Sequence, residues 1–138
     1  MEKIMDWLKT YPKWGDGEIT ADYLSPEPGS VALYQQGLQE TERKSDVLGN
    51  LTIGYRCRFL LRRMACPGDL WLEDFQNWVQ LQSAQGLAPS FGDVPASERI
   101  WAENGKLVEV SQPGTGVYQV TLVVDFIKIY EEKDHGEN

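Results

Sequence analysis

The chain has 138 residues, of which 41% are hydrophobic and 25% are charged, and its formal net charge at pH 7 is −8. This length and composition are typical of one folded domain and exclude a disordered chain. The acidic balance argues against direct binding to nucleic acid, because contact with phosphates requires positive surface. No apolar run is long enough for a membrane span and no secretory signal is present, so we expect no membrane association.

The first predicted elements are a short helix and a hairpin. Residues 2–10 carry apolar side chains at helical spacing, and Pro12 ends the helix because a proline forces the preceding residue out of helical conformation. Residues 18–24 and 30–36 have the composition of strands. The turn residues Ser25-Pro-Glu-Pro-Gly29 between them predict that the two strands pair as a hairpin.

The clearest strand signal runs from Leu51 to Arg63, where apolar side chains occupy every second position. Such alternation indicates one buried face and one polar face. Cys57 falls on the buried face, where it acts as a small apolar residue. The polar face carries three arginines: Arg56, Arg58 and Arg62.

These three arginines are candidates for a subunit interface. Residues 51–66 contain four arginines and no acid, a charge of +4, so the rest of the chain has a charge of −12. The arginines therefore form either a solvated sheet face or one half of an ionic contact with a neighbouring subunit. The sequence leaves both interpretations open.

From residue 68 to 85 the apolar spacing becomes helical, with Gly68-Asp69 as a start signal and Gly86 as a stop. This amphipathic helix contains two tryptophans and a phenylalanine, which predicts that it packs on the sheet. The loop over residues 86–97 carries apolar side chains that no regular structure would bury, so we expect it to order against a neighbouring subunit. These side chains are Leu87, Phe91 and Val94.

Two further strands are predicted over residues 100–111 and 116–130, on either side of a turn. Asn104-Gly105 marks a turn or a bulge within the first of them. In the second, the alternation changes phase after Phe126, which indicates either a bulge near Asp125 or burial of both faces there.

No linker or internal repeat divides the chain. We therefore predict a single α+β domain over residues 1–130, followed by a flexible acidic tail over residues 131–138. Its antiparallel sheet should carry the amphipathic helix on one face, with the short N-terminal helix at its edge.

The sequence contains no catalytic motif. His135 is the only histidine and lies in the tail, which excludes His-dependent nucleophiles and most His-based metal sites unless the tail folds back. Cys57 and Cys66 form no CxxC motif and are expected to stay reduced. Gly114-Thr-Gly116 lacks the lysine and the following helix of a phosphate-binding loop. We therefore expect no enzyme activity and no catalytic, metal-binding or cofactor-binding residues.

The five tryptophans fall into two groups. Packing accounts for Trp7, Trp71 and Trp78, which have core spacing. Periodicity does not place Trp14 or Trp101, and either is a candidate for an exposed anchor at an interface.

Five segments, in order along the chain, resemble a family of small minor capsid or minor tail proteins carried by phages and prophages of Gram-positive bacteria. They extend over nearly the whole chain apart from the acidic tail. One departure is the short connection over residues 64–71, which is longer in relatives. The segments are Met1–Gly15, Asp46-Val-Leu-Gly-Asn50, Leu72-Glu-Asp-Phe-Gln-Asn-Trp-Val79, Ala84–Gly92 and Gly114–Tyr130.

The resemblance implies a structural role at the head–tail junction or the tail end, as a head–tail joining or tail-terminator subunit with a tail-terminator-like architecture. It also implies a ring of identical subunits, with a hexamer favoured, which contacts other phage head or tail proteins. The expected locations are the virion and, before assembly, the cytoplasm of the bacterial host. An alternative is a small-molecule-binding α+β domain, whose pocket between helix and sheet would be lined by Phe75, Trp78 and Tyr55.

Overall fold

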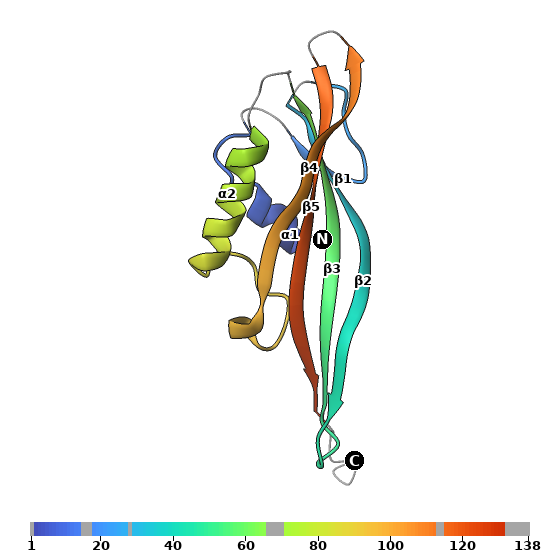
Figure 1. The fold of residues 1–138 in the computed structure, drawn as a ribbon, viewed down its shortest axis with the longest axis vertical. Helices are drawn as coiled ribbons and strands as arrows, with labels where there is room; N and C mark the ends of the chain where they lie inside the picture. The colour runs from blue at the N-terminus through green and yellow to red at the C-terminus, as the bar shows by residue number, and fades with distance from the viewer. Residues whose placement is uncertain (1, 15–17, 28, 66–70, 113–114, 132–138) are drawn as a thin grey trace.

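The computed structural model describes residues 2–14, 18–27, 29–65, 71–112 and 115–131. They form one α+β domain in which two helices lie on the same side of a five-stranded mixed sheet (Figure 1). The strand order is β1-β2-β3-β5-β4. The elements are α1 (Glu2–Leu8), β1 (Ile19–Ala21), β2 (Val31–Ser45), β3 (Leu51–Ala65), α2 (Trp71–Ala84), a 3₁₀ turn (Pro95–Ser97), β4 (Arg99–Gln112) and β5 (Thr115–Tyr130).

The three long predicted strands are confirmed as β3, β4 and β5, and β5 pairs antiparallel with both β3 and β4. The predicted start of the amphipathic helix at Gly68-Asp69 lies outside the described residues, as does all of the predicted tail except Glu131. Cys57 lies on the buried face as predicted, and burial raises the pKa of its thiol. Cys66 lies outside the described residues.

The predicted first hairpin is wrong, because β1 pairs with β2 in parallel. After β1 the chain does not make a tight turn but crosses to the end of β3. There the backbone N–H of Gly29 donates to the carbonyl of Met64, and the N–H of Met64 donates to the carbonyl of Ser30. These bonds set the register of the parallel pair, in which the first residue of β2, Val31, lies beside the first residue of β1, Ile19.

Strand β2 also runs nine residues past the predicted end at residue 36. Every residue from Gln35 to Gly49 is exposed. Because neither face of this part of the strand is covered, its sequence has no apolar alternation from which a strand could be predicted.

The core lies between the helices and one face of the sheet. Strands β3 and β5 supply alternate side chains, as the period-two pattern predicts. Helix α1 does not lie apart at the sheet edge but packs against α2, where the Trp7 and Trp78 rings stack 4.8 Å apart. The buried residues from these elements include Ile4, Trp7, Leu8, Cys57, Phe59, Leu61, Trp71, Phe75, Val79, Val120, Leu122 and Val124.

Trp14 belongs to this core and is not an exposed anchor. Its side chain is 5% exposed, and its indole N–H donates to the carbonyl of Leu8 at 2.7 Å. Trp78, in contrast, is only partly buried at the edge of the core. The sequence could not distinguish the two, because Trp14 follows the end of α1 and has no periodic neighbours.

Irregular pairing is found in the edge strand β4 and in the part of β2 beyond its pairing with β1. The β3–β5 register is continuous from Leu51 opposite Tyr130 to Ala65 opposite Gly116, so there is no bulge near Asp125 in this pairing. In β4 the register shifts between Glu103 and Lys106, which confirms a bulge at Asn104-Gly105. Bulges in edge strands hinder pairing with other chains.

The phase change in β5 has a different cause from a bulge. Beyond Asp125, β4 no longer pairs with β5. Asp93 from the preceding loop takes its place: its backbone N–H donates to the carbonyl of Ile127 at 2.7 Å, and its carboxylate accepts the N–H of Ile129 at 2.8 Å. The other predicted explanation, burial of both faces of β5, is not complete, because Ile129 is 40% exposed.

The turn between β2 and β3 is held by one carboxylate. Asp46 Oδ1 accepts the backbone N–H groups of Leu48 and Asn50 at 2.8 and 2.9 Å, and Oδ2 accepts the Asn50 side-chain amide at 3.0 Å. Gly49 has a φ of 87°, which favours glycine. The N–H of Asn50 is the main reason that the pKa of Asp46 lies below its usual value.

We expect this turn to loosen in acid. An aspartate whose pKa is lowered by folding stabilises the folded state fully above its unfolded pKa of about 3.9, and this contribution is lost as the pH falls through the lower folded value. In an NMR titration, the amide protons of Leu48 and Asn50 should shift with a midpoint below about 3.9. A midpoint above that value would contradict the hydrogen bonds, and Asp46→Ala should abolish the transition.

Candidate functional site

The face of the sheet that carries no helix is the candidate site, and we call it the open face (Figure 1). The register places the predicted polar face of β3 here: Arg58 lies opposite Val123 of β5, and Val123 lies opposite Trp101 of β4. The central residues of the open face are Tyr34, Arg56, Arg58, Arg62, Trp101 and Val123.

Arg56 is bound within its own chain. Its Nε and Nη2 donate to the two carboxylate oxygens of Asp125 at 2.8 and 2.9 Å, and its guanidinium lies over the Trp101 ring, 5.3 Å from the centroid. The hydrogen bonds to Asp125 raise the pKa of Arg56 above its usual value. Arg56 therefore already has, within its own chain, the acidic partner that a neighbouring subunit would supply under the interface interpretation.

Arg58 and Arg62 have weaker contacts. Arg58 Nη1 donates to the Gln39 side chain at 3.3 Å, and the Arg62 guanidinium lies 5.8 Å from the centre of the Tyr34 ring. Within the described part of the chain, the buried Nε of Arg62 has no hydrogen-bond partner. Most of the donors of these two arginines thus remain available to another molecule.

Replacement of Arg56 and of Arg58 by glutamine should therefore have different results. Arg56→Gln removes a partly buried bidentate ion pair and should lower the melting temperature of the monomer. Arg58→Gln removes one long hydrogen bond and should leave that temperature nearly unchanged. Thermal unfolding of the two variants at low protein concentration checks this, and equal melting temperatures would contradict the difference between the two sites.

The predicted interface loop lies elsewhere and is fixed by its own chain. The Glu98 carboxylate accepts the backbone N–H groups of Phe91 and Gly92, with the Phe91 bond at 3.0 Å. The Phe91 ring lies 6.0 Å from the ring of Phe126 on the helix side of the sheet. Contacts within its own chain therefore hold the loop, and its contact with a neighbouring subunit stays a prediction.

The three apolar residues of this loop differ in exposure. Leu87 is 60% exposed, whereas Phe91 and Val94 are partly buried. Leu87 is therefore the one that best fits the predicted contact with another subunit. The structure does not bring these residues together with the three arginines of the open face.

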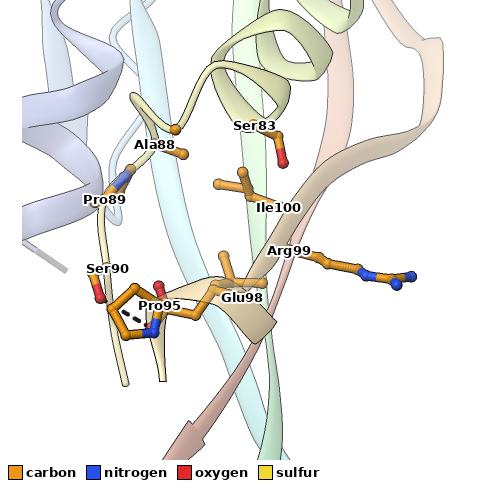
Figure 2. Close-up of a pocket in the computed structure, with 10 residues that line it drawn as sticks. Ser83, Ala88, Pro89, Ser90, Pro95, Glu98, Arg99 and Ile100 are labelled. Atoms are coloured by element: carbon orange, nitrogen blue, oxygen red, sulfur yellow. Dashed lines mark hydrogen bonds between the residues drawn. The ribbon is translucent and has the colours of Figure 1, made fainter. Parts of the chain in front are cut away.

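Two hollows lie along the helix side of β4. The first, of about 190 Å³, lies between the end of α2, the loop and the start of β4, and the Arg99 side chain points away from it (Figure 2). The second, of about 480 Å³, is a groove between α2 and β4. The first is lined by Ser83, Ala88, Pro89, Ser90, Pro95 and Ile100. The second is lined by Gln76, Gln80, Ser83, Ala84, Trp101 and Ala102, with Arg99 and Ile100.

Neither hollow is the pocket that the small-molecule alternative requires. Phe75 is fully buried, and its ring lies 5.3 Å from the rings of both Tyr11 and Trp14 and 5.8 Å from that of Trp78. Tyr55 lies apart, with its hydroxyl 3.3 Å from that of Tyr130. Aromatic rings therefore fill the space between helix and sheet in which the small-molecule alternative requires a pocket.

Sequence reasoning missed the role of Arg63, which was counted only for its charge. Arg63 is 7% exposed on the helix side of the sheet, with its guanidinium 5.5 Å from the Trp14 ring and 5.3 Å from the Trp71 ring. The period-two pattern does contain this signal, because Arg63 has the same parity as the buried Phe59 and Leu61. The contacts of Arg63 with the two tryptophan rings indicate that its role is to pack in the core.

Comparisons with known proteins give no family: no model of a protein family and no curated protein matches the chain. In the described ranges, no group of three or more His, Cys, Asp or Glu side chains could hold a metal ion. Neither described helix is long and apolar enough to cross a membrane, since the longer, α2, has 14 residues.

Proposed function

We propose that this chain is a structural component of a phage or prophage particle. It would act at the head–tail junction or the tail end, as a head–tail joining subunit or a tail terminator with the corresponding architecture. The resemblance of five ordered segments suggests this role, and the composition of the open face is the observation that carries it.

The open face has the composition of a protein interface. Aromatic residues and arginine are enriched at the centres of interfaces, whereas the solvent side of a one-sided sheet is normally polar. Here Trp101, Tyr34 and Leu60 are partly exposed beside the arginines. A second protein on this face would cover these apolar surfaces and supply acceptors for Arg58 and Arg62.

A ring also requires two different surfaces that meet head to tail. The two ends of the elongated sheet offer such a difference. Exposed apolar residues at one end are Val47 and Leu48 in the β2–β3 turn, and at the other end are Leu107, Val108 and Val110 of β4. The partners we propose are further copies of the chain, in a ring for which six subunits are favoured, and other head or tail proteins.

The acidic chain is not expected to bind nucleic acid directly, because its net charge is −8. We propose that the subunit resides in the cytoplasm of the bacterial host until it enters the virion. No catalytic role and no cofactor form part of the proposal.

Deletion of the gene from the phage or inducible prophage that carries it tests the proposal. After induction, electron microscopy should show heads without tails or tails of abnormal length, and the titre of infectious particles should collapse. A plasmid copy of the gene should restore both. Infectious virions with tails of normal length in the deletion strain would overturn the proposed function.

A further inference from the structure

The central part of the open face is positively charged, although the chain as a whole is acidic. The register that pairs Arg56 to Arg62 of β3 with the neighbouring strands brings five cations and two acids to this face. These seven residues have a net charge of +3. Because the whole chain has a charge of −8, the rest of it has a charge of −11. The cations are Arg56, Arg58, Arg62, Arg99 and Lys106, and the acids are Glu103 and Asp125.

Both acids of this face already have partners. Asp125 accepts two hydrogen bonds from Arg56, and the Glu103 carboxylate accepts the indole N–H of Trp101 at 3.2 Å. Among the residues that the structure describes, no salt bridge joins either of the two remaining arginines of β3 on this face to a carboxylate. The donors of these two arginines therefore remain for an anionic group from another molecule.

A hollow of about 210 Å³ lies beside the first of these two arginines, Arg58, between β2 and β3. Gly37, at a bulge of β2, lines it, and a Cβ added there would meet no atom within 4 Å. Because Gln39 Oε1 already accepts Arg58 Nη1, the Gln39 side chain offers its amide N–H donors to the hollow. Donors and positive charge together favour a carboxylate as the ligand. The hollow is lined by Gln36, Gly37, Leu38, Gln39, Arg56 and Arg58, none of which is an acid.

The second of these arginines, Arg62, sets the spacing of the acidic groups that fit. Arg58 and Arg62 are four residues apart on β3, about 13 Å along a strand, so one carboxylate cannot bridge them. Residues four apart in an extended peptide have the same separation and lie on the same side. Leu60 lies between the two arginines on this face, opposite Tyr34 of β2, and both are partly exposed. The pattern that fits is therefore acid–x–apolar–x–acid.

These observations favour a protein segment over a nucleic acid. Bases bind the face of a sheet by stacking on aromatic rings. On the open face, however, a guanidinium already lies over each ring: that of Arg56 is 5.3 Å from the centre of the Trp101 ring, and that of Arg62 is 5.8 Å from the centre of the Tyr34 ring. The acidic remainder of the chain also repels a long polyanion, whereas a short segment with two acids contacts the basic face alone.

We infer that the open face binds an extended acidic segment of a different protein, with one carboxylate at Arg58, a second at Arg62 and an apolar side chain on Leu60 between them. The inference deepens the proposed function, because it names the chemistry of the partner. Identification of that partner as another head or tail protein rests on the proposed function.

NMR titration of isotope-labelled protein with a synthetic peptide tests the inference. The probe is Ser-Asp-Thr-Val-Thr-Asp-Ser with both ends capped, and the control peptide has asparagine in place of both aspartates. The probe should shift the signals of Arg58, Leu60 and Arg62 and should bind at least about tenfold more tightly than the control, because hydrogen bonds to charged groups are the stronger ones. Equal affinities, or shifts confined to other parts of the protein, would overturn the inference.

A pair of variants tests whether Arg58 itself holds the peptide. Arg58→Gln should weaken binding of the probe at least about tenfold. Lys9→Gln is the matched control, because it removes one positive charge from an exposed residue that follows α1 on the helix side of the sheet, and it should leave the affinity nearly unchanged. An equal loss in the two variants would mean that the overall charge attracts the peptide, which would overturn the site.

Other occupants of the open face give different results in the same titration. A single-stranded oligothymidylate that shifts these signals at lower concentration than the probe would assign the face to a nucleic acid. Inorganic phosphate with that effect would assign it to small anions. Shifts of the same signals with protein concentration, without peptide, would assign it to a second copy of the chain. Each of these three results would overturn the inference.

The titration uses purified protein, so its outcome is separate from that of the gene deletion. No binding of the probe, together with loss of tailed particles after deletion, would overturn the inference and leave the proposed function standing. Binding of the probe, together with normal particles after deletion, would overturn the proposed function and leave the acidic-segment site standing.

Discussion

Replacement of Phe75 by alanine should lower the free energy of unfolding by about 3–5 kcal/mol, as truncation of a large aromatic side chain in a core does. Phe75 is fully buried and lies among the rings of four aromatic residues. These neighbours come from α2 itself and from the segment that follows α1, so the cavity cannot close without moving both. The four residues are Tyr11, Trp14, Trp71 and Trp78.

Denaturant titration of purified protein measures this effect. Phe91→Ala is the matched control, because Phe91 is only partly buried and contacts a single aromatic ring, that of Phe126, so it should cost clearly less. A loss below about 1 kcal/mol for Phe75→Ala would mean that α2 does not present this residue to the core.

Periodicity predicted those parts of the fold that have one buried and one exposed face. The alternation in β3 correctly separated Cys57 and Phe59 on the helix side from Arg56 and Arg58 on the open face. Helical spacing likewise identified α2. The sheet and the helices share one buried interface. Whether a residue of β3 or α2 is buried therefore depends on which side of its own strand or helix it occupies.

Periodicity failed where burial is absent or depends on distant residues. The outer part of β2 has no buried face, so its sequence could not distinguish a strand from a loop. The parallel pairing of β1 depends on backbone bonds between Gly29, Ser30 and Met64, which are distant in sequence. Trp14 is buried against Arg63, which is far from it in the sequence, so no local spacing predicts the burial of Trp14.

The candidate site was predicted in part. The sequence placed Arg56, Arg58 and Arg62 on one face but could not show that Asp125 already binds Arg56, because the pairing of β3 with β5 decides which acid is opposite. The exposed outer part of β2 and the turn that follows it were missed for a related reason. The sequence alone does not show whether the apolar Val47 and Leu48 of this turn are covered. The structure shows that both are exposed.

Gly92→Ala should detach the loop that follows α2 and lower the free energy of unfolding by about 1–3 kcal/mol, the usual cost of forcing an extra carbon into a packed site. A Cβ at Gly92 would lie 2.3 Å from the carbonyl oxygen and 3.0 Å from the nitrogen of Ile127. Both are backbone atoms of β5, which is held by β3 along its whole length, so the loop must move instead of the strand.

Movement of the loop should break the bonds from Asp93 to Ile127 and Ile129, and hydrogen exchange at the Ile129 amide should become faster. Gly105→Ala is the matched control. There the nearest atoms are the ends of the Leu72 and Gln76 side chains, at 3.3 and 3.4 Å, which can rotate away. We expect that control to change stability by less than about 0.5 kcal/mol. If the two variants unfold at the same denaturant concentration, close contact between the loop and β5 does not determine the path of the loop.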